Sequence, residues 1–117
     1  RAPYGVAARE ALQARGLWET LQPKLVPAET VNQALQYAET GNVEAALIAR
    51  SLCSEGQGRW SLVPQALHRP IDQALAVVRG CAHEEAARRF ADFITGPIGQ
   101  AILSVYGYEN PLTPETQ

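Results

Sequence analysis

The 117-residue chain has no methionine, only two cysteines and no long uncharged apolar run. A membrane-spanning helix needs about 18 or more consecutive apolar residues, so none is predicted. The chain has ten basic and twelve acidic residues, which give a net charge of −2, and the basic residues form no cluster in the sequence. Nucleic-acid binding is therefore not expected. The rest of the composition, 46% hydrophobic and 19% charged, is that of one soluble globular domain at most.

Side chains that carry catalytic or metal chemistry are also scarce. Cys53 and Cys81 are too few and too far apart for a metal site or a redox CxxC motif. We expect two unpaired thiols, although the sequence leaves pairing in an oxidising compartment open. His68 and His83 have no further ligand at metal-binding spacing, and no nucleophile motif is present. The sequence therefore predicts neither a metal site nor an enzyme.

The most informative local pattern lies between Lys24 and Gly41. Thr30 followed by Gln33 forms a capping box that starts a helix, and its apolar positions recur on one face. The N–H groups of Val31 and Asn32 remain free in such a cap. A packed helix with free N–H groups at its positive end is able to bind an anion. An ordinary capped helix remains the alternative reading of the same residues.

The remaining patterns predict an α/β fold. A helix is expected from Pro3 to Gly16, followed by one helical turn at 17–21. Strands are expected at 24–27 and 43–49, on either side of the capped helix, which would form a right-handed βαβ unit. Further strands are expected at 60–63 and 71–78. Two C-terminal helices, separated by Gly96-Pro97, end near Gly107.

Several ordered segments resemble one known family. They are Ala2-Pro3-Tyr4-Gly5, Ala8–Leu12, Gly16-Leu17-Trp18, Pro23-Lys24-Leu25, Val31–Leu35, Thr40-Gly41-Asn42, Val63-Pro64 with Leu67-His68, Ala86-Ala87-Arg88 with Phe93, and Gly99–Leu103 leading to Tyr106-Gly107-Tyr108. Together they resemble the periplasmic molybdate-binding proteins of molybdate ABC transporters. The similarity extends over nearly the whole chain and is therefore much more specific than a single motif.

The resemblance implies the C-terminal half of a two-lobed protein of the type II periplasmic-binding-protein class, with a βαβ core and two C-terminal helices. Residues 1–79 would belong to the second lobe, residues 80–108 would pack on the first lobe, and residues 109–117 would form a flexible tail. The implied ligand is molybdate or tungstate, without a cofactor, and the implied partner is the membrane permease of the transporter. The backbone N–H groups of Tyr4 and Val31, both at helix starts, would bind the oxyanion.

Two departures from the family pattern matter. Ala49 stands where some members carry a tyrosine hydroxyl donor. The chain begins at Arg1 without a methionine or leader, so we expect that an N-terminal portion, with the serine-bearing first lobe, is missing. Sheet edges left without that lobe would be exposed, and self-association of the fragment is expected.

An effector-sensing domain of a cytoplasmic transcription regulator is the alternative function, and an enzyme of the same fold is less favoured.

Overall fold

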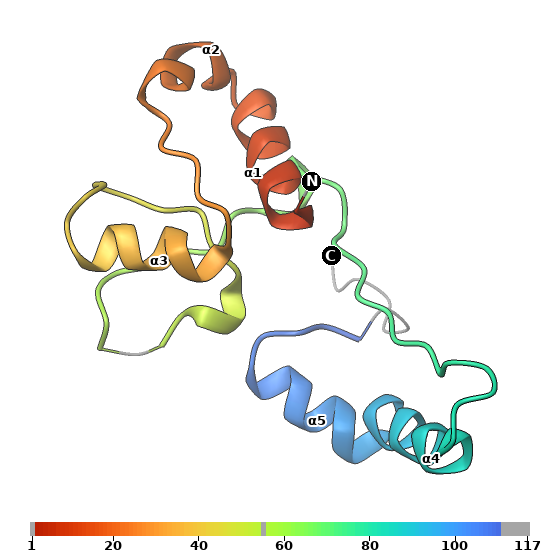
Figure 1. Cartoon of the computed structure of the whole chain (residues 1–117). Coiled ribbons are helices and arrows are strands. Elements are labelled where there is room, and N and C mark those ends of the chain that lie inside the picture. Colours follow the sequence, from red (N-terminus) through yellow and green to blue (C-terminus); the bar gives the residue numbers. More distant parts are fainter. Residues whose placement is uncertain (1, 55, 111–117) are drawn as a thin grey trace. The chain divides into compact units, whose positions relative to one another are not determined.

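The computed structural model describes residues 2–54 and 56–110 (Figure 1). In these residues the chain forms five α-helices and three short 3₁₀ turns: α1 (Pro3–Ala14), α2 (Trp18–Leu21), η1 (Gln22–Lys24), α3 (Val31–Glu39), η2 (Arg50–Leu52), η3 (Gln65–Leu67), α4 (Glu84–Thr95) and α5 (Pro97–Val105). The chain divides into two compact units between Ile71 and Asp72. The predicted boundary after residue 79 stays a prediction.

In the first unit, α1 begins and ends as the sequence predicts. Pro3 occupies the first turn, where its missing N–H costs nothing. Gly16 adopts a left-handed conformation with φ 67°, which allows the Leu17 N–H to donate to the Leu12 carbonyl at 2.9 Å. The helical turn α2 follows directly. The Arg9 guanidinium lies over the Trp18 ring, 4.8 Å from its centroid, and this cation–π contact joins α2 to α1.

The predicted cap of α3 is confirmed, with one difference. The Gln33 N–H donates to the Thr30 hydroxyl oxygen at 3.1 Å, as a capping box requires. The Gln33 side-chain oxygen, however, accepts from the Glu29 N–H at 2.7 Å and not from the Thr30 N–H. At the other end, Gly41 has φ 76° and completes the helix as predicted.

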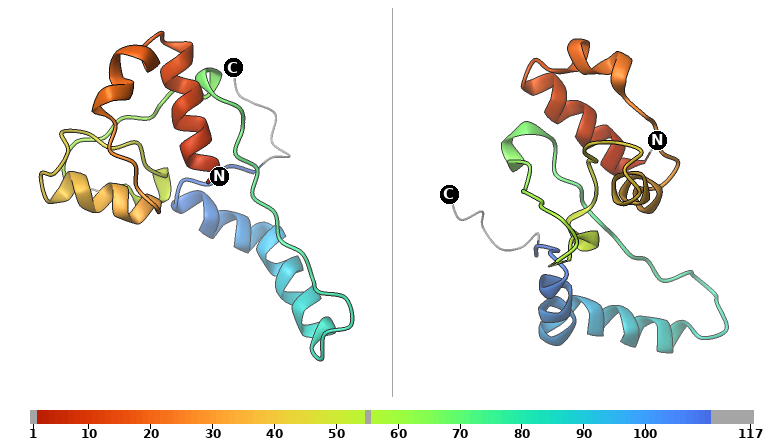
Figure 2. Two further views of the ribbon diagram at one scale, coloured as in Figure 1. Left: turned by 45° about the horizontal axis from the view of Figure 1, so that its top comes forward. Right: turned by 90° about the vertical axis from the view of Figure 1, so that its left-hand side faces the viewer.

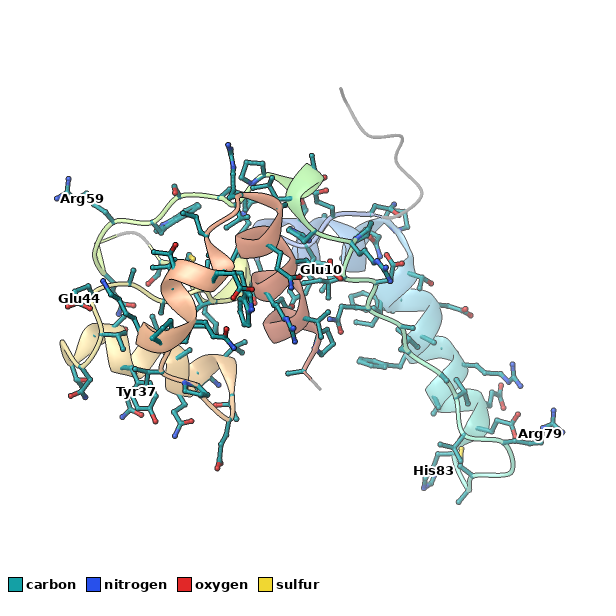
Figure 3. All side chains as sticks on the ribbon, turned by 90° about the horizontal axis from the view of Figure 1, so that it is seen from above. Glu10, Tyr37, Glu44, Arg59, Arg79 and His83 are labelled. Atoms are coloured by element: carbon teal, nitrogen blue, oxygen red, sulfur yellow. The ribbon has the colours of Figure 1, made fainter. Side chains whose placement is uncertain are left out.

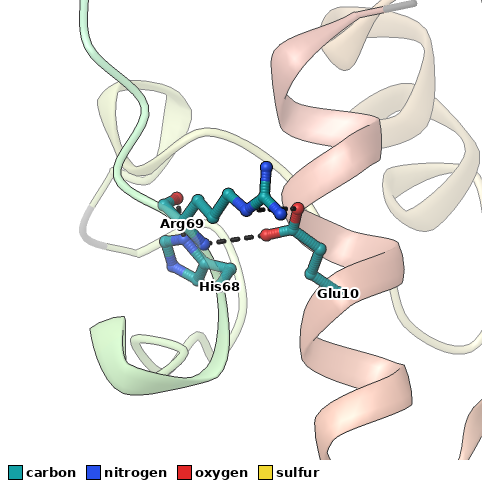
Figure 4. Close-up of polar contacts among 3 residues, drawn as sticks. All are labelled: Glu10, His68 and Arg69. Atoms are coloured by element: carbon teal, nitrogen blue, oxygen red, sulfur yellow. Dashed lines mark hydrogen bonds and ion pairs between the residues drawn. The ribbon is translucent and has the colours of Figure 1, made fainter.

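The segment around η3 is held against α1 by the carboxylate of Glu10 (Figure 4). The Arg69 N–H donates to Glu10 Oε2 at 2.8 Å, and Arg69 Nε lies 3.9 Å from Oε1. Next to it, His68 Nδ1 lies 2.8 Å from the Arg69 carbonyl oxygen. Residues distant in sequence are thereby joined within the first unit.

In the second unit, α4 and α5 pack on each other across the predicted break at Gly96-Pro97. The Gln100 side-chain amide donates to the Ile94 carbonyl at 3.1 Å, and Gly99 is buried. A Cβ at Gly99 would contact the Phe93 carbonyl and would lie 2.6 Å from the Ile94 Cα. The absence of a side chain at this position therefore permits the close approach of the two helices.

The predicted βαβ core is not formed among the described residues, which contain helices, turns and irregular segments but no strand. The ranges 24–27, 43–49, 60–63 and 71–78 were expected to be strands because of their apolar residues. A strand forms only when its backbone groups pair with those of a neighbouring strand. The helix between residues 24–27 and 43–49 does not by itself place these two ranges so that their backbones can pair. Apart from Lys24, which ends η1, these ranges are non-helical as expected, but the strand pairing is missing.

Few apolar side chains are buried as a result. In residues 2–54 and 56–110 the buried hydrophobic residues are Ala7, Ala11 and Ala49, whereas Val26 is 55% exposed and Val78 is 72% exposed. None of the helices in the described part of the chain has the length and hydropathy of a membrane span. Residues 111–117 of the predicted flexible tail lie outside the described residues.

Candidate functional site

The N-terminus of α3 presents several consecutive backbone donors. The first N–H bonded within the helix is that of Ala34, which donates to the Thr30 carbonyl at 3.1 Å. No acceptor in the described part of the protein takes the N–H of Val31 or Asn32. Among the described residues the N–H of Thr30 has no acceptor either, because the Gln33 side chain bonds to Glu29. Three adjacent N–H groups at the positive end of this helix dipole are therefore without an acceptor in the described part of the chain.

The capping-box pattern did not predict the third of these donors. The pattern assigns the returning bond of Gln33 to the Thr30 N–H, whereas in the structure the bond shifts by one residue to Glu29. Both arrangements use the same residue types at the same spacing. No sequence signal could have distinguished them.

The N-terminus of α1 is the second predicted donor position. Ala2 is the N-cap and has no capping side chain, and the helix begins with Pro3. Because proline lacks an N–H, Tyr4 is the first residue within the helix that has one. Its side chain is half-buried.

The N-terminal ends of α1 and α3 lie side by side within the first unit, as the views in Figures 1 and 2 agree. The starts of α1 and α3, which are far apart in the sequence, therefore lie in the same region of the first unit. The positive ends of two helix dipoles are directed to this region. Backbone donors and dipoles of this kind favour a fully ionised oxyanion, which accepts hydrogen bonds and has no proton to donate.

The other position named from the sequence is Ala49, which is 4% exposed. Its methyl group cannot donate a hydrogen bond, so this residue adds no side-chain donor to a ligand. Its carbonyl oxygen lies 3.9 Å from Cys53 Sγ. Cys53 and Cys81 are both half-buried free thiols.

Titratable groups do not gather into a catalytic or metal-binding cluster in the described ranges. These residues contain no group of three or more His, Cys, Asp or Glu side chains that could hold a metal ion. His83 and Arg79 lie near the start of α4 (Figure 3). Close by, the Arg88 guanidinium donates a hydrogen bond to the Glu84 carboxylate at 2.8 Å, and the Gly80 N–H donates a second one. These bonds, chiefly the one from Arg88, lower the pKa of Glu84 below its ordinary value. This ion pair belongs to the second unit and stabilises α4.

The sequence of residues 1–109 matches the family described as bacterial extracellular solute-binding protein. The chain belongs to this family. Membership implies the periplasmic-binding-protein fold. No solved structure matches the chain significantly.

Three relatives of the chain carry the same name, molybdate-binding protein ModA. The protein of Rhodobacter capsulatus is 40% identical over 109 residues, which cover 92% of this chain and 43% of the relative. The protein of Escherichia coli (strain K12) is 36% identical over 109 residues, which cover 91% of this chain and 42% of the relative. The protein of Azotobacter vinelandii is 34% identical over 112 residues, which cover 92% of this chain and 44% of the relative. The chain thus spans less than half the length of these solute-binding relatives.

Proposed function

We propose that the chain is part of the solute-binding component of an ABC importer for molybdate or tungstate. The relatives that support this proposal are named for molybdate binding and match over nine-tenths of the chain. The observation that carries it is that two helix N-termini lie near each other in the first unit. The alternative, an effector-sensing domain of a transcription regulator, gains no support from these relatives.

In the proposed site, the N–H groups of Tyr4 and Val31 donate to the oxygens of a tetrahedral oxyanion. Such a dianion needs donors, and backbone N–H groups supply them without a proton that can be lost at working pH. The N–H groups of Thr30 and Asn32 flank the Val31 donor and add to the positive potential. The protein binds and does not transform its ligand, so neither a catalytic residue nor a cofactor is part of the proposal.

The proposal extends to the fold of the complete binding protein. In it, residues 24–27 and 43–49 pair as strands on either side of α3, because neighbouring strands supply the missing hydrogen-bond partners. Residues 1–79 belong to one lobe, and the C-terminal helices within residues 80–108 pack on the other. The protein works in the periplasm and delivers its ligand to the membrane permease of the transporter.

A chimera tests this function. The matched region of the Rhodobacter capsulatus relative is replaced by residues 1–109 of this chain, which aligns with it over 109 residues at 40% identity. We expect the chimera to bind molybdate, measured by calorimetric titration, and to bind sulfate more weakly. A chimera that folds, as judged by its far-ultraviolet circular dichroism, and binds neither molybdate nor tungstate would contradict the proposal.

A further inference from the structure

Helix α1 has little apolar packing to hold it in the first unit. Its buried residues are Ala7 and Ala11, one turn apart, and each alanine buries only a single methyl group. The cation–π contact of Arg9 joins α1 to Trp18 of α2, which follows α1 directly along the chain. A contact between successive elements does not fix a helix against more distant parts of the chain. The orientation of α1 therefore depends on the segment around η3, against which it packs.

Glu10 makes the polar contact between α1 and this segment. It lies three residues after Ala7 and next to Ala11, so it borders the buried face of the helix, and its side chain is 28% exposed. Its Oε2 accepts the Arg69 N–H at 2.8 Å (Figure 4). The Arg69 side chain is 91% exposed, and an exposed ion pair contributes little. The bond to the backbone N–H is therefore the part of the contact that fixes α1.

The backbone that Glu10 contacts is itself held in place. His68 Nδ1 lies 2.8 Å from the Arg69 carbonyl oxygen. Because a carbonyl only accepts, the His68 ring donates this bond. The His68 N–H donates in turn to the Gln65 carbonyl at 3.3 Å and closes η3. Glu10 therefore fastens α1 to an ordered turn.

Glu10 and the proposed donor Tyr4 belong to the same rigid element. Glu10 lies six positions after Tyr4 in a helix of 12 residues, a separation of about 9 Å along the helix axis. A change of helix tilt at Glu10 therefore also moves the Tyr4 N–H. Hydrogen bonds weaken steeply when their angle departs from linearity. The Tyr4 N–H can thus donate well to a ligand only in a narrow range of helix orientations.

We propose that Glu10 is a positioning residue of the oxyanion site. By accepting the Arg69 N–H, it holds α1 in the orientation in which the Tyr4 N–H donates to the ligand. Glu10 itself touches no ligand. This inference rests on the proposed function and adds to it a residue that acts through α1.

The charge of Glu10 distinguishes positioning from electrostatics. A carboxylate about 9 Å from a dianion repels it, although salt reduces this repulsion. Glu10→Ala and Glu10→Gln remove the same charge, so electrostatics alone would strengthen binding slightly and equally in both variants. Positioning predicts weaker binding in Glu10→Ala. It predicts nearly unchanged binding in Glu10→Gln, whose side-chain oxygen can still accept the Arg69 N–H.

Calorimetric titration with molybdate of the chimera with the Rhodobacter capsulatus relative tests the proposal. The loss of one exposed hydrogen bond shifts an equilibrium by about fivefold, and this factor limits the affinity that a misplaced α1 can lose. We expect Glu10→Ala to raise the dissociation constant by about three- to fivefold and Glu10→Gln by less than about twofold. Arg69→Ala keeps the backbone N–H and should also change it by less than about twofold.

Glu39→Ala is the matched control. Glu39 is an exposed carboxylate at the last position of α3, and its removal takes the same charge from the other helix of the proposed site. It should change the dissociation constant by less than about twofold.

Two further measurements separate positioning from a general loss of folded protein. Partial unfolding would lower the number of binding sites per chain, whereas positioning raises the dissociation constant and leaves that number unchanged. Molybdate should also protect the Tyr4 amide from hydrogen exchange less strongly in Glu10→Ala than in the original chimera. Its protection of the Val31 amide, which belongs to α3, should be retained.

The possible failures are distinguishable. A chimera of the original sequence that folds and does not bind molybdate would contradict the proposed function, on which this inference rests. When that chimera binds, three results would overturn the role of Glu10. They are an affinity of Glu10→Ala equal to or higher than the original, equal losses in Glu10→Ala and Glu10→Gln, and a loss confined to the number of sites.

Discussion

The Arg69 N–H donates to Glu10 Oε2 at 2.8 Å, across 59 positions of sequence. This bond fastens the segment around η3 to α1, which also carries the Tyr4 end of the proposed site. The acceptor is a charged oxygen, and bonds to charged groups are stronger than neutral ones. The orientation of α1 within the first unit therefore depends partly on a carboxylate that lies away from the helix start.

Replacing Glu10 tests this contact. Glu10→Ala removes the acceptor and should speed hydrogen exchange of the Arg69 amide about fivefold, corresponding to about 1 kcal/mol for an exposed bond. Glu10→Gln retains a side-chain oxygen at the same place and should have less than half of this effect. Equal exchange rates in both variants and in the original chain would show that the contact does not hold the segment.

The helices could be predicted from the sequence because their signals are local. Pro3 and Thr30 start helices, Gly16 and Gly41 end them, and each signal acts within one turn. The strands could not be predicted in the same way, because apolar character specifies a buried segment while pairing depends on a distant partner. The proposed binding donors are backbone N–H groups, which every residue except proline carries, so no residue type marks them in the sequence. The positions of Tyr4 and Val31 could be named only from their places at helix starts and from the family resemblance.

Gly99 is expected to be essential for the packing of α5 on α4. Gly99→Ala places a methyl group against the main chain at Phe93 and Ile94, which should destabilise the second unit by about 1–3 kcal/mol. Gly5→Ala is the matched control, because a methyl group at Gly5 would meet nothing within 4 Å. It should stabilise α1 by about 0.5–1 kcal/mol. The helical signal followed during urea titration measures the stability of both variants. A Gly99→Ala variant that is as stable as the original chain would contradict the described packing.

The start of α4 should lose stability in acid. Hydrogen bonds from Arg88 and from the Gly80 N–H lower the pKa of Glu84 below its ordinary value of 4.5. A carboxyl group with a lowered pKa stabilises the folded state above its unfolded pKa, and this contribution is lost as the pH falls through the folded value. Helical content should therefore fall as the pH is lowered through the ordinary value of 4.5 and below it. Glu84→Gln should reduce this dependence, while Glu85→Gln should preserve it.

The isolated chain is expected to bind molybdate weakly. Two or three charge-assisted hydrogen bonds contribute about 3–9 kcal/mol, and association costs about 4 kcal/mol or more. The difference corresponds to millimolar binding or none. Calorimetric titration of the chain alone with molybdate measures this directly. Micromolar affinity would show that donors outside this chain are unnecessary.

The most direct test of the proposed function compares Val31→Asp with Gln36→Glu in the chimera with the Rhodobacter capsulatus relative. Both changes add one negative charge to α3, but only the first adds it at the helix end that would bind the oxyanion. A negative residue at a helix start is compatible with the helix dipole, so Val31→Asp should leave α3 intact. We predict that Val31→Asp weakens molybdate binding by at least about tenfold through repulsion of the dianion, and that Gln36→Glu changes it by less than about twofold. Equal affinities for molybdate in the two variants would contradict the assignment of the oxyanion to this helix end.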